Sequence, residues 1–219
     1  YGIAAREMSF EEIKKNYRAN PLNCPDFEAA EKMIAKILEI KDEGDTCGGV
    51  VEIIARGVPA GLGEPVFDKL SATIAYGLMS IGAVKGVEIG AGFGVARMKG
   101  SECNDLPYME KDKVCFRTNN AGGFMGGISN GEDLVIRMAV KPTPTISMAQ
   151  DSIDKSVMKP AKLAAITRRD ATICPRIYPV AEAMVRFAIL DALYMWRGWQ
   201  GVQNVGPACA EASADKRKS

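Results

Sequence analysis

The stretch that decides the fold is residues 57–90, which read GVPAGLGEPVFDKLSATIAYGLMSIGAVKGVEIG. Its first part combines prolines with glycines, a composition typical of a rigid, turn-rich connector. Its middle part predicts a helix over residues 66–81, because apolar side chains recur about every four residues along one side. These side chains are Leu70, Ile74, Leu78 and Ile81. Its last part, residues 84–90, is short and apolar and predicts a strand.

Upstream of this stretch, the sequence predicts two helices and a strand. Ser9 and Glu12 have the spacing of a capping box, which opens a short helix. A longer helix with apolar residues at helical spacing follows Pro25. Residues 48–58 are rich in valine and isoleucine and predict a buried strand that leads into the quoted stretch.

Downstream, the pattern predicts one further strand and one further helix. Residues 133–141 alternate as a strand does, and residues 179–196 have helical periodicity. Two stretches without periodicity are predicted to be irregular connections, residues 99–113 and residues 148–162. We expect a single domain over residues 1–200 and a disordered tail over residues 201–219.

The composition excludes several classes of function. Lys and Arg total 28 and Asp and Glu total 27, so the net charge of +1 gives no support for a nucleic-acid partner. The longest apolar region, residues 181–196, is interrupted by charges, so we expect no membrane partner. Six cysteines without a C-x-x-C pair favour reduced thiols in a cytoplasmic protein. The sequence has no histidine, so we predict no metal site and no Ser-His or Cys-His pair within it.

Residues 119–131 form a glycine-rich block with two interpretations. Its glycines are Gly122, Gly123, Gly126, Gly127 and Gly131. Glycines let backbone amides approach a ligand closely and allow conformations that point amides at an anion. The same composition is also typical of tight turns that flank a hairpin. The block has neither the Walker spacing nor the G-x-G-x-x-G spacing.

Residues 141–145, Lys-Pro-Thr-Pro-Thr, follow the strand predicted at 133–141. A lysine and two hydroxyls on a proline-stiffened segment suit a phosphate or a planar polar ring, because the rigid backbone lowers the cost of ordering. The alternative is a turn at a sheet edge with a solvated lysine.

Charged residues gather before the last predicted helix. Arg168, Arg169 and Arg176 lie near Asp170 in the sequence. Three guanidinium groups can bind a multiply anionic substrate through paired hydrogen bonds, and the acid can then serve as a base. The alternative is a surface cluster of ion pairs at the start of the helix.

Taken in order, these blocks resemble the chorismate synthase family, a group of flavin-dependent lyases. The resemblance rests on residues 57–70 and 79–90, the glycine block, the Lys-Pro-Thr block, and Arg168-x-Asp170 followed by Arg176, and it runs from about residue 24 to residue 193. It implies an α+β fold, a β-α-β sandwich in which antiparallel sheets enclose helices. It also implies a homotetramer.

The resemblance also implies a reaction and a cofactor. Family members belong to the shikimate pathway of aromatic amino-acid biosynthesis and convert 5-enolpyruvylshikimate 3-phosphate to chorismate and phosphate. This 1,4-elimination needs reduced FMN but has no net redox change. The flavin is reduced either by the enzyme itself with NADPH or by an external reductase.

Carried over one position at a time, the family's acid near the flavin falls at Asp170. Its FMN contacts fall at nine positions of this sequence. These are Gly82, Ala83, Gly126, Lys141, Pro142, Thr143, Pro144, Thr145 and Arg168.

The sequence departs from the family pattern in its histidines. Family members carry two catalytic histidines, arginines for the substrate and a Ser-Ala-Arg segment, all upstream of the matching blocks. We therefore expect the chain to begin after these segments, to need that N-terminal portion and to be inactive alone. Arg169 stands at a usual histidine position and cannot release a proton near neutral pH. The alternative is a non-catalytic flavin- or phosphate-binding paralogue, or a structural subunit.

Overall fold

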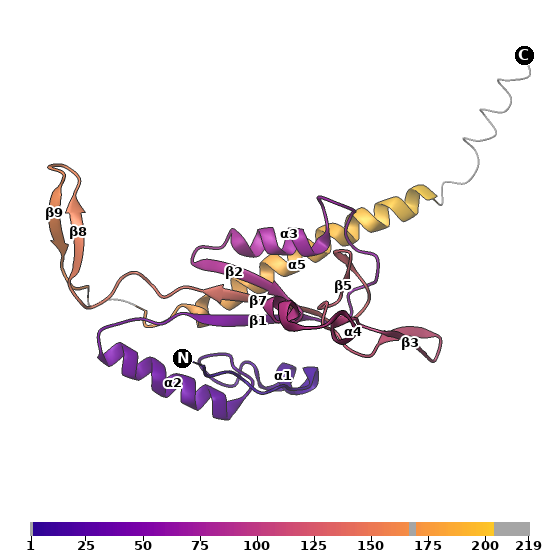
Figure 1. Cartoon of the computed structure of the whole chain (residues 1–219), viewed down its shortest axis with the longest axis horizontal. Coiled ribbons are helices and arrows are strands. Elements are labelled where there is room, and N and C mark those ends of the chain that lie inside the picture. The colour runs from indigo at the N-terminus through magenta and orange to yellow at the C-terminus, as the bar shows by residue number, and fades with distance from the viewer. Residues whose placement is uncertain (1, 167–169, 204–219) are drawn as a thin grey trace, which may run out of the picture. The chain divides into compact units, whose positions relative to one another are not determined.

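A computed structural model describes residues 2–166 and 170–203 of the 219-residue chain (Figure 1). Its elements in chain order are α1 (Phe10–Asn16), α2 (Phe27–Asp42), β1 (Gly49–Ala55), α3 (Leu70–Met79), β2 (Val84–Ile89), the 3₁₀ helix η1 (Gly92–Arg97), α4 (Gly100–Cys103), β3 (Pro107–Glu110), β4 (Lys113–Phe116), β5 (Phe124–Met125), β6 (Ile128–Ser129), β7 (Leu134–Val140), β8 (Gln150–Asp154), β9 (Lys159–Leu163) and α5 (Cys174–Gln203). Helices and antiparallel hairpins together confirm the predicted α+β class.

The chain divides into two compact units, each built from three stretches of sequence. Unit 1 comprises Tyr1–Glu52, Ile81–Val87 and Arg137–Ala181. Unit 2 comprises Ile53–Ser80, Glu88–Ile136 and Glu182–Ser219. The predicted single domain over residues 1–200 stays a prediction.

The largest sheet has the strand order β1-β7-β2. Its central strand, β7, alternates in burial, and Leu134, Ile136 and Met138 are fully buried on one face. This alternation is the period of two that a half-buried strand requires. The strands predicted at residues 48–58, 84–90 and 133–141 correspond to these three strands. The prediction that the first of them is buried was wrong, because Ile53 is the one buried residue of β1.

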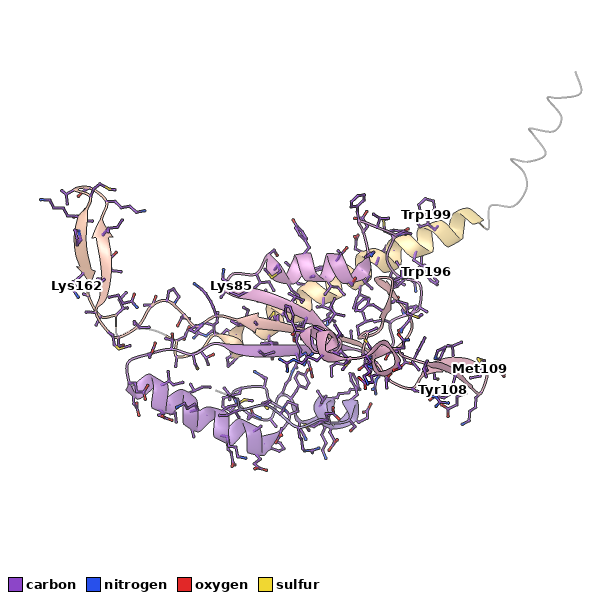
Figure 2. The ribbon with its side chains drawn as sticks, in the orientation of Figure 1. Lys85, Tyr108, Met109, Lys162, Trp196 and Trp199 are labelled. Atoms are coloured by element: carbon purple, nitrogen blue, oxygen red, sulfur yellow. The ribbon has the colours of Figure 1, made fainter. Side chains whose placement is uncertain are left out.

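The other strands of the described residues form three two-stranded antiparallel hairpins: β3–β4, β5–β6 and β8–β9. Strand β3 lies within residues 99–113, and β8 and most of β9 lie within residues 148–162, so the prediction of irregular connections there was wrong. The reason is exposure on both faces. Tyr108 and Met109 are adjacent on β3 and are both exposed, as is Lys162 on β9 (Figure 2). A strand without a buried face has no reason to alternate.

Helix α3 packs its predicted apolar side into the core of unit 2. Leu70, Ile74 and Leu78 are each at most 1% exposed. The helix begins at Leu70 rather than at the predicted residue 66, and it ends at Met79, so Ile81 lies beyond it. Val66 has φ +70°, a left-handed conformation that a helix cannot include. The turn that precedes the helix is therefore longer than the turn predicted from the sequence.

Helix α5 differs from its prediction at both ends. It begins at Cys174 and contains Pro179, the residue at which the sequence predicted its start. Pro175 occupies the second helical position, in the first turn, where proline is tolerated because the N–H has no helical partner. The helix continues to Gln203, so residues 201–203 of the predicted tail are helical. Residues 204–219 lie outside the described part of the chain.

The N-terminal helix α1 confirms the predicted capping box. The Ser9 hydroxyl accepts a hydrogen bond from the Glu12 backbone N–H, and the Glu12 carboxylate accepts one from the Ser9 backbone N–H at 3.0 Å. Within residues 2–166 and 170–203, no helix combines the length and apolar character needed to cross a bilayer.

Candidate functional site

Two of the predicted cofactor-contact regions lie side by side in unit 1. The backbone N–H of Lys141 donates a hydrogen bond to the carbonyl oxygen of Ala83 at 2.9 Å. Ala83 has φ +73°, a left-handed conformation that is uncommon for a residue with a Cβ. Gly82 and Lys141 are both exposed. The turn before β2 and the segment after β7 thus form one accessible edge.

Thr143 joins this edge to Asp170. Its hydroxyl donates to the Asp170 carbonyl oxygen at 3.0 Å. Its own carbonyl oxygen accepts from the Thr46 hydroxyl at 2.7 Å. Three segments distant in the sequence therefore meet at Thr143, and Thr46 was not among the predicted site residues.

The carboxylate of Asp170 forms an ion pair with Arg176. The Arg176 guanidinium donates to Asp170 Oδ2 at 2.8 Å, and the Asp170 side chain is 38% exposed. This geometry orients the carboxylate while leaving part of it accessible. The predicted neighbours Arg168 and Arg169 lie outside the described residues.

The remaining residues of the Lys-Pro-Thr block are also accessible. Pro142 and Pro144 are exposed, and Thr145 is half-buried. Pro144 and Thr145 line a small cavity of about 210 Å³ in unit 1, together with residues of the segment that leads into and out of the β8–β9 hairpin. The other lining residues are Ile146, Met148, Gln150, Leu163, Ala164 and Ile166.

The predicted contact Gly126 lies in unit 2, on the turn of the β5–β6 hairpin. Met125 pairs with Ile128, so Gly126 and Gly127 form a two-residue loop, with φ +60° and +89°. Positive φ at both positions identifies a type I′ turn. This part of the glycine block therefore has the hairpin structure that was one of its two interpretations. The other predicted contacts that the structure describes, Gly82, Ala83 and residues 141–145, belong to unit 1.

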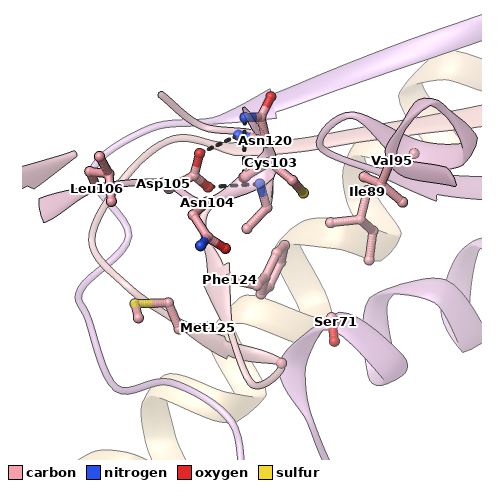
Figure 3. A pocket seen from close by; sticks show the side chains of 13 residues that line it. Ser71, Ile89, Val95, Cys103, Asn104, Asp105, Leu106, Asn120, Phe124 and Met125 are labelled. Carbon is pink, nitrogen blue, oxygen red and sulfur yellow. Dashed lines mark hydrogen bonds between the residues drawn. The ribbon is translucent and has the colours of Figure 1, made fainter. Parts of the chain in front are cut away.

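Unit 2 also contains a cavity of about 680 Å³, which sequence reasoning missed (Figure 3). Its volume falls in the range of small-molecule sites. Gly127, the neighbour of Gly126, is part of its wall. The other lining residues are Ser71, Ile89, Gly92, Val95, Cys103, Asn104, Asp105, Leu106, Asn120, Ala121, Phe124 and Met125.

The acid in this cavity, Asp105, is engaged in holding its wall. Its Oδ1 accepts from the Thr118 hydroxyl at 2.6 Å and from the Asn120 N–H at 2.8 Å, and its Oδ2 accepts from the Ala121 N–H at 2.8 Å. Desolvation raises the pKa of Asp105, but these three hydrogen bonds outweigh it and hold the pKa below its usual value. Its three hydrogen bonds make Asp105 a structural anchor of the cavity wall.

Two cysteines of unit 1 lie near Asp170 in the sequence or in space. The Cys47 thiol donates to the Ala171 carbonyl oxygen at 3.7 Å, and the Thr172 hydroxyl accepts from the Cys174 backbone N–H at 3.4 Å. Burial raises the pKa of both thiols, Cys174 raises that of Cys47 further, and the nearby Thr172 side chain offsets this only in part. Because the thiolate is the nucleophile, these protonated thiols are suited to packing rather than catalysis.

The unit 1 edge, with Asp170 beside it, carries both hydrogen-bond donors and acceptors, which suits a polar ring or another ligand that presents both. It offers a lysine ammonium, threonine hydroxyls and a carboxylate held by an arginine. Among the residues that the structure describes, no group of three or more His, Cys, Asp or Glu side chains could hold a metal ion.

Comparison with known proteins identifies the family of this chain. A sequence model of chorismate synthase matches residues 2–194. The chorismate synthase of Acetivibrio thermocellus is 58% identical over 211 residues, which is 94% of this chain and 54% of that protein. The chorismate synthase of Methanosarcina mazei is 55% identical over 190 residues, 87% of this chain and 52% of that protein.

A solved structure agrees with the sequence comparisons. A crystal structure of chorismate synthase matches with a TM-score of 0.68 and 33% identity, over 84% of this chain and 48% of the other. The chain spans about half the length of the curated relatives it matches. The chain therefore belongs to the chorismate synthase family.

Proposed function

We propose that this chain takes part in the chorismate synthase reaction, the 1,4-elimination of phosphate from 5-enolpyruvylshikimate 3-phosphate to give chorismate. The observation that carries the proposal is the family match over residues 2–194, together with 58% identity to the A. thermocellus chorismate synthase. The same proposal includes reduced FMN as the cofactor, a homotetrameric assembly and a cytoplasmic location.

The residues of the unit 1 edge fit the chemistry of FMN. The exposed Lys141 ammonium suits a phosphate or a carbonyl oxygen of the ring. The left-handed conformation of Ala83 is of the strained kind that clusters at ligand sites. In this proposal Gly82, Ala83 and residues 141–145 hold the flavin, with Gly126 and Arg168 as further contacts. When bound, the reduced flavin supplies electron density as phosphate leaves.

Asp170 is the proposed proton-handling group. Its carboxylate can accept a proton, and the hydrogen bonds from Arg176 and Thr143 fix the position of the residue. General acid–base catalysis depends on such positioning within hydrogen-bond reach of the reacting proton.

The first experiment is a titration of FMN fluorescence with the 219-residue chain. We expect Lys141→Ala to weaken FMN binding by about 10- to 100-fold, the equivalent of one hydrogen bond to a charged group. Lys85→Ala is the matched control, because Lys85 is an exposed lysine of β2, outside the proposed contacts (Figure 2). Equal affinities for both variants and the unsubstituted chain would contradict the proposed cofactor site.

The second experiment measures phosphate release from 5-enolpyruvylshikimate 3-phosphate with reduced FMN. The chain is assayed alone and with the part of the A. thermocellus enzyme that it does not match. We expect turnover only in the mixture, and we expect Asp170→Asn to abolish it with little change in FMN affinity.

The sequence contains no histidine, which favours a second candidate function: a flavin-binding subunit without catalytic activity. FMN binding without phosphate release in either assay would support that candidate.

A further inference from the structure

A short segment before β1 contacts the stretch that follows the Lys-Pro-Thr block and the residue that follows Asp170. We name residues 44–48 the bracket segment. The Gly44 carbonyl oxygen accepts from the Ser147 N–H at 2.8 Å, just beyond the Lys-Pro-Thr block. The Cys47 N–H donates to the Ala171 carbonyl oxygen at 2.8 Å, one residue after Asp170. The bracket segment therefore links two stretches that are far apart in the sequence.

Between these two backbone bonds, Thr46 makes a side-chain bond to the Lys-Pro-Thr block itself. Its hydroxyl donates to the Thr143 carbonyl oxygen at 2.7 Å, and the residue is only 5% exposed. Removing the hydroxyl leaves the carbonyl oxygen of the half-buried Thr143 without this donor, and an unmade hydrogen bond in a partly desolvated place costs stability. An apolar side chain of the same shape at position 46 would keep the packing but could not donate this hydrogen bond.

The bracket segment also packs tightly against the end of β7. A Cβ added to Gly48 would lie 2.2 Å from the Val140 carbonyl oxygen and 3.1 Å from the Lys141 carbonyl carbon. Both neighbours are backbone atoms, so they can move only if the strand end moves. The bracket segment and the start of the Lys-Pro-Thr block are thus held at van der Waals contact.

The hydrogen bonds continue from Thr143 to Asp170. The Thr143 hydroxyl donates to the Asp170 carbonyl oxygen at 3.0 Å. Thr46, Thr143 and Asp170 therefore form one chain of hydrogen bonds, of which Thr46 is the buried end. A shift at Thr46 reaches both the proposed flavin contacts and the proposed proton-handling residue.

We infer that Thr46 is a positioning residue, which holds residues 141–145 and Asp170 in the geometry that binds FMN. This inference rests on the proposed function of the same edge. Thr46 acts through Thr143 and contacts neither cofactor nor substrate in this scheme. Its loss weakens FMN binding without removing any group that touches the flavin.

The test compares three variants of the 219-residue chain. Thr46→Val removes the hydroxyl and keeps the shape, and Thr46→Ser restores a hydroxyl. Thr73→Val is the matched control in unit 2. The Thr73 hydroxyl donates to the Lys69 carbonyl oxygen at 3.2 Å, but that carbonyl keeps its helical partner, the Thr73 N–H, at 3.0 Å. The control thus leaves no carbonyl unpaired.

Two quantities are measured: the FMN dissociation constant, by fluorescence, and hydrogen exchange at the Lys141 and Cys47 amides. We expect Thr46→Val to weaken FMN binding about 3- to 10-fold, the equivalent of one neutral hydrogen bond. We also expect faster exchange at both amides. Thr46→Ser should recover both quantities, and Thr73→Val should change neither.

Unchanged exchange at both amides in Thr46→Val would overturn the inference. Unchanged FMN affinity in a chain that does bind FMN would also overturn it. If the unsubstituted chain does not bind FMN at all, the proposed cofactor site fails, and the exchange measurement still decides whether Thr46 holds the two segments.

Discussion

Ala83 offers a direct test of the backbone conformation at the candidate site. Its φ of +73° places a residue with a Cβ in the left-handed region. Glycine adopts this region without steric cost. Ala83→Gly should therefore relieve strain at the turn whose carbonyl oxygen accepts the Lys141 N–H.

The size of the strain energy at Ala83 can be isolated by comparing Ala83→Gly with Ala91→Gly. Ala91 is half-buried like Ala83 but has φ −70°, an ordinary helical value. Both substitutions remove one methyl group and add the same freedom to the unfolded chain, so these costs cancel in the difference. What remains is the left-handed strain of alanine, about 1–2 kcal/mol. For a chain of this length, that difference corresponds to roughly 2–8 °C in melting temperature.

The assay is differential scanning calorimetry of the two variants and the unsubstituted chain in one buffer. We expect Ala91→Gly to lower the melting temperature. The melting temperature of Ala83→Gly should exceed that of Ala91→Gly by roughly 2–8 °C. It should lie close to or above the melting temperature of the unsubstituted chain. Equal melting temperatures for the two variants would show that Ala83 is not strained, and would remove this argument for a ligand at the turn.

Two further predictions concern unit 2. Because the folded pKa of Asp105 is lowered, its contribution to stability is present above the unfolded value of about 3.9 and is lost as the pH falls through the folded pKa. Asp105→Asn should thus melt at a lower temperature than the unsubstituted chain at pH 6, and this difference in melting temperature should shrink as the pH is lowered. A difference that does not change with pH would contradict this. Gly90→Ala should destabilise by about 1–3 kcal/mol or more, because its Cβ would lie 2.1 Å from the Asn120 carbonyl oxygen at φ +58°. Gly94→Ala, which meets no atom within 4 Å, is the control in urea unfolding, and an equal loss in both would refute the close contact.

The sequence predicted the elements that bury one face. Leu70, Ile74 and Leu78 mark α3, and the alternation in residues 133–141 marks β7, because burial imposes the helical or strand period on the residue types. The hairpins β3–β4 and β8–β9 are exposed on both sides, so no such period is required of them. The boundary at Val66 was wrong for a related reason: its left-handed conformation depends on surrounding structure and has no signal in the residue type.

In the candidate site too, some residues could be predicted from the sequence and others could not. The Lys-Pro-Thr block and Asp170 could be singled out from the sequence because their residue types suit anions and proton transfer. Thr46 could not, since its role depends on a carbonyl oxygen 97 positions away in the sequence. Asp105 is similar, because its function follows from two backbone N–H groups and a hydroxyl that only the folded loop brings together.

The hydroxyl of Thr143 has one further consequence, for the polarity of any ligand on the unit 1 edge. A threonine hydroxyl carries a single proton, and that of Thr143 is committed to the Asp170 carbonyl oxygen. Toward a ligand, Thr143 can then offer only lone pairs, and it selects an N–H or O–H group rather than a phosphate oxygen. Lys141 has only protons to offer and selects the opposite partner. Lys141 therefore binds an acceptor group of a ligand, and Thr143 binds a donor group of the same ligand. A ligand that presents only acceptors can bond to Lys141 but not to the Thr143 hydroxyl.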